Sequence, residues 1–285
     1  MNHQILFYLH PKLLPKKKIM KKFCLAIVLF AVSCSSPRVT ITNVKSPDPA
    51  IIDGKIFATA WQQRSAEYKA LCYQAFNIAR IRVEQSNQAI SSKPKAIMTD
   101  IDETLLNNSP YEVHQLMQGK DYDDASWKDW TSRGIADTMP GALHFLQYAS
   151  ASGIEIFYVT NRDQSEREGT LKNLKKFNFP NADNEHLLLK GNSSSKEGRK
   201  NTIAETHTIV LLMGDNMNDF SALFEKKNPD DRAKVADDFA GDFGNRFIVL
   251  PNPVYGDWEF SLYHFNYSLT PAQKDSVLRS SLYGY

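Results

Sequence analysis

Apolar and polar positions follow one another in blocks that predict strands separated by helices. Short apolar runs, typical of buried strands, lie at 95–99, 154–159, 208–213 and 246–250, with a shorter one at 186–189. Buried strands that alternate with helices are typical of a parallel sheet covered on both faces. The pattern therefore predicts an α/β fold with a Rossmann-like, doubly wound parallel sheet.

The segments between these runs have the spacing of helices. We expect a long helix at about 54–88 and a polar, helical region at 103–139 that forms a small cap. Further helices are expected after the Pro-Gly pair at 140–141, near 165–177 and from about Ser195. The cap would therefore be an insertion that follows the first strand.

The N-terminus has the pattern of an export signal. Residues 1–33 contain six lysines and no acidic residue, and an apolar stretch runs from Phe23 to Val32. This stretch is too short to cross a bilayer, whose core needs about 20 apolar residues in a helix. It is typical of a cleaved signal peptide, and both Met1 and Met20 remain open as the start of translation.

A lipid anchor is predicted at the end of this signal. "AVSC", residues 31–34, resembles the lipobox of bacterial lipoproteins, in which the cysteine is lipidated and becomes the new N-terminus. The resemblance implies lipidation of Cys34, with plain secretion after cleavage near Ser33 as the alternative. Residues 34–53 are polar and proline-rich, as expected of a tether, which leaves 54–285 as the folded domain.

The charge of the chain argues against nucleic acid as a partner. The formal net charge is +2, but removing the six lysines of the signal from the 34 basic residues leaves 28 against 32 acidic ones, or −4. Binding to nucleic acid without sequence preference needs clustered cations that neutralise phosphates. We therefore expect no nucleic-acid partner.

Polar side chains follow directly after three of the predicted strands. They are, in chain order, Asp100, Asp102, Thr160, Asn161, Arg162, Asp215 and Asp219. Lys196 begins a predicted helix between the last two groups. Ligands of open α/β sheets bind at the carboxyl ends of the strands, so we expect these side chains at one edge. Two carboxylates as close as Asp100 and Asp102 raise one another's pKa unless a cation compensates them, which indicates a metal ion, a reaction, or both.

These segments carry a resemblance to a known family. "DIDET", "TNR", a following lysine and "GDNMNDF" resemble the four motifs of the haloacid dehalogenase superfamily of phosphohydrolases. "DETLLNNSPY", "YVTNRD" and "LPNPVYGDWE" are similar to segments of the class C nonspecific acid phosphatases, which are outer-membrane lipoproteins. The resemblance covers roughly 56–265 and departs mildly at Met98, Thr99 and Met217. It implies the haloacid dehalogenase fold, hydrolysis of phosphomonoesters and a place in the outer membrane, facing the periplasm or the cell surface.

The resemblance also implies a role for each motif residue, and phosphoryl transfer needs each of these groups. Asp100 would attack phosphorus and form an aspartyl-phosphate. Asp102 would protonate the leaving oxygen and then activate water. Thr160 and Lys196, beside Asn161, would bind the phosphoryl oxygens.

Mg²⁺ is the cofactor that the resemblance implies. It prefers oxygen ligands in octahedral geometry, so the Asp100 carboxylate, the Asp102 backbone carbonyl and Asp215 would share it with phosphate and water. Asp219 would support the metal site without binding the ion directly, by orienting a bound water or Lys196.

Aromatic residues predict the substrate class. Tyr255 lies on a loop bounded by proline and glycine after the last strand, and the cap offers Tyr111, Trp127 and Trp130. Tyr255 and one cap tryptophan would hold a flat base between them, whereas Trp127 is expected to pack the cap onto the core. The resemblance implies nucleoside monophosphates, including nicotinamide mononucleotide. We expect Tyr111, Trp130, Arg162 and Tyr255 to contact the substrate.

Two other functions share part of this pattern. A two-component receiver also uses an acid cluster, Mg²⁺, a threonine and a lysine, but the export signal, the chain length and the second Asp of "DID" argue against it. A non-enzymatic surface binding protein on a phosphatase scaffold is the other alternative, and the presence of Asp100 argues against that. Both a monomer and a homodimer are compatible with the sequence.

The predicted lipid anchor can be tested directly. We expect Cys34→Ser to release the protein from membranes, because serine has no thiol to accept the lipid. Fractionation of cells that express the wild type and the variant, followed by immunoblotting, measures this release. A variant that stays in the membrane fraction would show that another segment anchors the protein.

Overall fold

The computed structural model describes residues 49–285, which are built around a five-stranded sheet with the strand order β5-β4-β1-β6-β7. The strands are β1 (Lys95–Thr99), β4 (Glu155–Val159), β5 (Leu187–Leu188), β6 (Thr208–Gly214) and β7 (Phe247–Val249). Every neighbouring pair in this sheet runs parallel. The predicted doubly wound parallel sheet is therefore confirmed.

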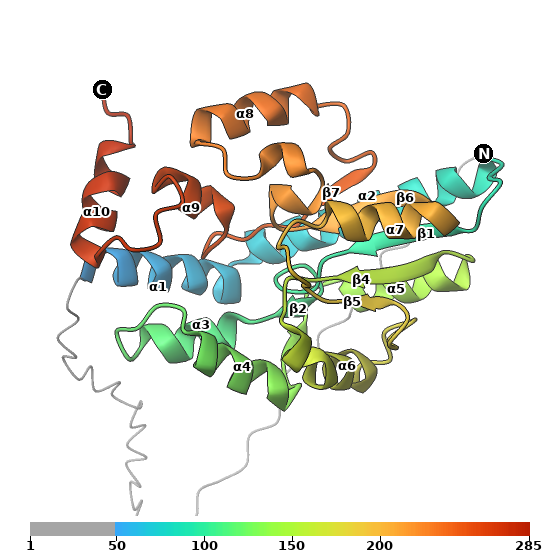
Figure 1. Cartoon of the computed structure of the whole chain (residues 1–285), viewed down its shortest axis with the longest axis horizontal. Helices are drawn as coiled ribbons and strands as arrows, with labels where there is room; N and C mark the ends of the chain where they lie inside the picture. The colour runs from blue at the N-terminus through green and yellow to red at the C-terminus, as the bar shows by residue number, and fades with distance from the viewer. Residues whose placement is uncertain (1–48) are drawn as a thin grey trace, which may run out of the picture. The chain divides into compact units, whose positions relative to one another are not determined.

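Helices cover both faces of the sheet (Figure 1). They are α1 (Pro49–Arg64), α2 (Ala66–Gln88), α3 (Ser109–Leu116), α4 (Asp124–Arg133), α5 (Ala142–Ala151), α6 (Arg167–Lys176), α7 (Glu197–Thr206), α8 (Pro229–Asp238), α9 (Asp257–Leu262) and α10 (Pro271–Ser280). Apolar residues of α2, α5 and α6 share one core cluster with one face of the sheet, and Ile203 of α7 joins the cluster on the other face.

Alternation along the strands divides the core between the two faces. In β1, Ile97 belongs to the α2 and α5 cluster, whereas Met98 belongs to the α7 cluster. In β4, Tyr158 and Val159 are divided in the same way. Successive side chains of a strand point to opposite faces, and both faces here are covered. The inner positions of these strands are therefore apolar on both faces, which is the pattern that predicted them.

The first helical segment differs from its prediction in two ways. It begins at Pro49 rather than near 54, so the predicted tether overlaps the start of α1. It is also two helices instead of one, because Ser65 leaves the helical conformation and its side chain accepts a hydrogen bond from the backbone N–H of Tyr68 at 3.0 Å. Such a serine cap satisfies a free donor at the start of α2.

The predicted cap follows β1 and contains more than helices. The short strands β2 (Leu106–Asn107) and β3 (Asp137–Thr138) pair in antiparallel fashion and close the base of the insertion, which holds α3 and α4. In Figure 1, α1, α3, α4, α9 and α10 lie together beyond one end of the sheet. Because α1 also contacts α3 and α10, both ends of the described chain contribute to this group.

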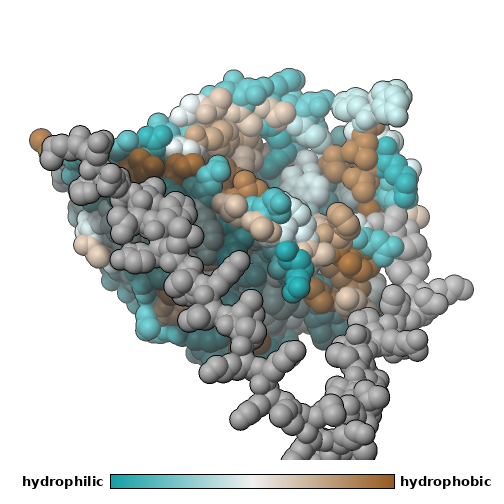
Figure 2. All heavy atoms as spheres, turned by 180° about the vertical axis from the view of Figure 1, so that it is seen from behind, coloured by the Kyte–Doolittle hydropathy of each residue, from teal (hydrophilic) through white to brown (hydrophobic). Residues whose placement is uncertain are grey.

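The predicted signal peptide, Cys34 and most of the predicted tether lie outside the described residues. Within 49–285, no helix combines the length and the apolar character needed to cross a membrane. On the face turned away from the viewer of Figure 1, hydrophobic residues form separate groups among hydrophilic ones (Figure 2).

Candidate active site

A cleft of about 510 Å³ lies at the carboxyl ends of β1, β4 and β6. Nine of the predicted site residues line it together: Asp100, Asp102, Thr160, Asn161, Arg162, Lys196, Asp215, Asp219 and Tyr255. The sheet order changes direction at β1, between β4 and β6, and such switch points are where open α/β sheets bind ligands. The structure thus brings the predicted side chains to one place.

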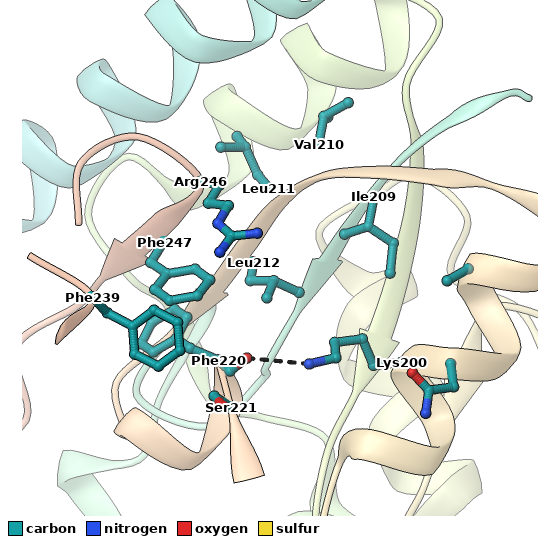
Figure 3. A pocket seen from close by; sticks show the side chains of 12 residues that line it. Lys200, Ile209, Val210, Leu211, Leu212, Phe220, Ser221, Phe239, Arg246 and Phe247 are labelled. Carbon is teal, nitrogen blue, oxygen red and sulfur yellow. Dashed lines mark hydrogen bonds between the residues drawn. The ribbon is translucent and has the colours of Figure 1, made fainter. Parts of the chain in front are cut away.

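A second hollow, of about 330 Å³, lies on the α7 face of the sheet and has a different character (Figure 3). Its walls are mostly apolar and carry no carboxyl group among the residues that line it. The ammonium group of Lys200 donates to the backbone carbonyl of Phe220 at 3.4 Å (Figure 3). Lys196, one turn earlier in the chain, contacts the acids of the first cleft instead. Because the acids and Lys196 line the first cleft, we take it as the candidate active site.

Lys196 joins the ends of two strands. It lies directly before α7 and is buried, and its ammonium group donates a short hydrogen bond to Asp100 Oδ1. The same group pairs with Asp219 Oδ1 at 2.6 Å. The backbone N–H of Asp100 donates to the carbonyl of Met213 in β6 at 2.9 Å. Asp100 is therefore fixed through its main chain and one carboxylate oxygen.

Asp219 returns to the end of β6 through a tight turn. Asn216 caps the 3-10 turn η2 (Met217–Asp219), and its own backbone N–H donates to Asp219 Oδ2 at 3.0 Å. A Cβ at residue 214 would collide with the side chain of Asp219. Glycine at 214 is therefore required for this close approach, and both oxygens of Asp219 are occupied.

Two acids of the cluster, Asp100 and Asp215, have raised pKa values. Burial raises the pKa of Asp100 to about 7, and the charges of Asp219 and Asp102 add to this while Lys196 opposes it. Burial and the charge of Asp100 hold the pKa of Asp215 well above its ordinary value. Burial alone would lower the pKa of Lys196, but Asp100 and Asp219 raise it. The carboxyl groups of Asp100, Asp215 and Asp219 therefore outnumber the one ammonium group, that of Lys196, that pairs with the cluster.

The donor set fits a divalent cation. Asp100, Asp215 and Asp219 each place one carboxylate oxygen within 4.8 Å of the others. Carboxylate oxygens are the ligands of hard cations such as Mg²⁺ and Mn²⁺, and a cation would offset the excess negative charge. Because both oxygens of Asp219 are engaged by protein groups, Asp100 and Asp215 are the carboxylates best placed to hold it.

Asp102 has its own positive partner. The guanidinium of Arg162 contacts it through Nη2 at 2.7 Å and through Nε at 3.1 Å, and Asn108 Nδ2 donates at 2.8 Å. The remaining nitrogen of Arg162, Nη1, donates to Thr170 at 3.0 Å. Arg162 lines the cleft, but its nitrogens are committed to these protein groups. Arg162 therefore orients Asp102, and its predicted contact with the substrate stays a prediction.

The residues after β4 meet an arginine that the sequence did not single out. Thr160 is buried, and its hydroxyl accepts a hydrogen bond from the backbone N–H of Arg162 at 3.2 Å. Arg199 donates to the carbonyl of Thr160 at 2.5 Å and to Asn161 Oδ1 at 2.7 Å. It lies three residues after Lys196 in α7, and this helical spacing is the signal that could have identified it.

Asn252 is a second residue that was missed. It follows β7 and donates from Nδ2 to Asp215 Oδ2 at 2.8 Å, while the Thr104 hydroxyl lies 3.4 Å from Asp215 Oδ1. The rule that identified the acids, that polar residues at strand ends converge, applies equally to Asn252.

Among the aromatic residues that line the cleft, Tyr255 was predicted to contact the substrate and Trp127 was not. Tyr255 lines it with its hydroxyl donating to Glu103, and Trp127 lines it with the Arg162 guanidinium 5.8 Å from its ring centre. Tyr111 and Trp130 are not among the lining residues. Tyr111 is buried against Trp127, with ring centres 5.1 Å apart, and the Trp130 indole donates to Asn108 at 2.8 Å. These two residues pack within the cap, and their predicted substrate contacts stay predictions.

Known proteins resemble the chain in both sequence and structure. Residues 26–258 match the family model of the HAD superfamily, subfamily IIIB (acid phosphatase). The class C acid phosphatase of Bacillus anthracis is 36% identical, with a TM-score of 0.80 over 82% of this chain and 99% of that chain. Its structure with tungstate bound gives a TM-score of 0.79 at 36% identity, over 82% and 98% of the two chains.

More distant similarity extends to plant proteins. Acid phosphatase 1 of Solanum lycopersicum is 27% identical over 164 residues, which are 55% of this chain and 56% of that protein. The stem 31 kDa glycoprotein of Glycine max is 24% identical over 236 residues, or 79% and 83% of the two chains. The match thus spans little more than half the length of the tomato protein.

The proposed ligand role of Asp215 can be tested without any activity. We expect saturating MgCl₂ to raise the melting temperature of the wild type by roughly 5 °C or more, since a ligand that binds only the folded state stabilises it. Asp215→Asn should respond much less, because it lacks one anionic ligand. Thermal unfolding with and without MgCl₂ measures this, with Asp237→Asn on exposed α8 as the control. An equal shift in Asp215→Asn would exclude Asp215 as a ligand.

Proposed function

Because this chain belongs to the acid phosphatases of subfamily IIIB in the haloacid dehalogenase (HAD) superfamily, we propose that it is a Mg²⁺-dependent phosphomonoesterase. It acts through an aspartyl-phosphate, and nucleoside monophosphates are its favoured substrates. One observation carries the proposal: Lys196 holds Asp100 by one oxygen in a cleft that also contains Asp102. The binding of tungstate, a tetrahedral oxyanion like phosphate, by the Bacillus anthracis relative supports it.

Asp100 is the nucleophile in this proposal. Its Oδ1 is paired with Lys196, and its Oδ2 receives only a long contact of 3.4 Å from the Thr104 hydroxyl. Oδ2 is therefore the oxygen that attacks phosphorus, forming a new O–P bond as the bond to the leaving alcohol breaks. When bound, Mg²⁺ supplies positive charge that lets an anionic carboxylate approach an anionic phosphate.

Asp102 moves the protons. It gives a proton to the leaving alcohol in the first step, and in the second it takes one from the water that attacks phosphorus, which releases phosphate and restores Asp100. Arg162 fixes the direction of the Asp102 carboxylate through two nitrogens. The Lys196 ammonium and the Thr160 hydroxyl stabilise the phosphoryl oxygens.

A flat base would lie between Tyr255 and Trp127. The hydrogen bond from Tyr255 to Glu103 fixes one ring, and the edge contact of Trp127 with Tyr111 fixes the other. Rings that are already immobilised lose little entropy when a base stacks on them. In this proposal, Trp127 is the cap tryptophan that stacks on the base opposite Tyr255.

We also propose that a lipid on Cys34 holds the domain at the outer membrane. The lipobox at 31–34 and the polar segment after it support this proposal. The substrate would then be a small phosphomonoester that reaches the periplasm or the cell surface.

The proposed reaction is tested by steady-state hydrolysis of a panel of phosphomonoesters, with and without EDTA. We expect turnover that EDTA abolishes and that Mg²⁺ restores. Asp100→Asn should fold normally and lose at least about 10³-fold in kcat, because it removes the attacking oxygen. Phosphatase activity that survives in this variant would contradict the mechanism.

The base-stacking role of Tyr255 predicts a selective defect. We expect Tyr255→Ala to raise KM for nucleoside 5′-monophosphates about tenfold or more, the lower end of the stacking energy of about 1–3 kcal/mol per base. Tyr255→Phe should keep most of the affinity, since it keeps the ring and loses only the hydrogen bond to Glu103. A small aliphatic phosphomonoester is the control substrate. An equal loss on both substrates would mean that Tyr255 supports the fold or the chemical step.

A further inference from the structure

The cleft also contains a carboxyl group that has no hydrogen-bond or ion-pair partner among the described residues. Glu112 lies in the first turn of α3, is 7% exposed, and lines the cleft together with Lys55 and Asp121. Within residues 51–285, no hydrogen bond or ion pair at the usual distances reaches its carboxyl group. Its oxygens are not among the fully buried unpaired atoms of the described residues, so they open to the cleft and are available for a group that enters it.

The charges around Glu112 are unequal. Lys55 is already engaged, since its ammonium group pairs with Asp121 at 2.8 Å and with Glu259 at 3.2 Å. Lys274 lies 3.6 Å from Asp121. Glu112, Asp121 and Glu259 thus present three carboxyl groups to two ammonium groups.

The titration of Glu112 agrees with this imbalance. Burial raises the pKa of Glu112 to about 7, with Asp121 and Glu259 adding to the effect and Lys55 opposing it. The charge of Glu112 in turn helps to raise the pKa values of Glu103 and Tyr255. Glu112 and Tyr255 line the same cleft, so both can contact the organic part of a bound substrate.

Three aromatic residues, which we call the aromatic wall, also line the cleft. Tyr122, Phe260 and Tyr267 line it, and the rings of Phe260 and Tyr267 lie 5.1 Å apart. Tyr122 directly follows Asp121, and Phe260 directly follows Glu259. Aromatic faces beside a carboxylate are the surroundings in which proteins bind ammonium groups.

We propose that Glu112 and this aromatic wall bind the organic part of substrates that carry a positive charge, so that cationic phosphomonoesters are favoured over neutral ones of the same shape. A cationic group would neutralise the excess negative charge of these carboxyl groups, whereas a neutral group would leave that charge uncompensated. The proposal rests on the phosphatase function proposed above and adds a specificity-determining residue to it.

Two substrates of nearly identical shape test this selectivity. Phosphocholine and 3,3-dimethylbutyl phosphate differ in one atom, a charged nitrogen in place of a neutral carbon. At about pH 7.5, we expect the wild type to favour phosphocholine at least about fivefold in kcat/KM, within the range of cation binding by aromatic and anionic groups. Glu112→Gln keeps the size of the side chain and should bring the ratio close to one by raising KM for phosphocholine.

The neutral ester and a second variant serve as controls. Glu112→Gln should hydrolyse 3,3-dimethylbutyl phosphate as the wild type does, and Asp129→Asn, which removes an exposed acid of α4, should keep the preference. A preference that survives in Glu112→Gln, or a loss of both activities in it, would overturn the proposal. Equal hydrolysis of the two esters by the wild type would overturn this inference alone. No hydrolysis of either ester would contradict the proposed function as well.

Discussion

The buried pairing of Lys196 with Asp100 and Asp219 is the interaction on which the rest of the site depends. It connects the ends of β1 and β6 to the start of α7, and all three side chains are buried. Charges removed from water cost several kcal/mol each unless they are well paired. Removing Lys196 would leave two buried acids beside Asp215 without their counter-charge, and removing Gly214 would displace Asp219. The arrangement therefore depends on the ammonium group of Lys196 and on the absence of a side chain at Gly214.

The same constraint explains why two carboxylates can lie two residues apart. β1 ends at Thr99, so the strand no longer determines where Asp100 and Asp102 point. Asp100 is directed into the buried cluster by Lys196, and Asp102 is directed to the cleft by Arg162. Because each acid has a separate positive partner, the two can perform different chemistry on one phosphoryl group.

The sequence predicted the sheet and its acidic edge because both rest on local patterns. Strands buried on both faces are apolar throughout, and parallel strands bring their carboxyl ends together. The helix break at Ser65, the helix α10 with no buried residue, and the roles of Arg162 and Trp127 depend on packing between distant segments. A sequence pattern does not contain such contacts. An arginine that orients an acid and an arginine that binds a substrate look the same until the partners of the side chain are known.

The most direct test of this account is to trap the phosphate on Asp100. The enzyme is quenched during turnover and treated with borohydride, which reduces an aspartyl-phosphate to homoserine. Mass spectrometry of the peptides then locates the homoserine in the chain. We predict homoserine at position 100, only when substrate and Mg²⁺ are both present. Homoserine at another acidic residue, or phosphate release at full rate with no homoserine at position 100, would contradict Asp100 as the nucleophile.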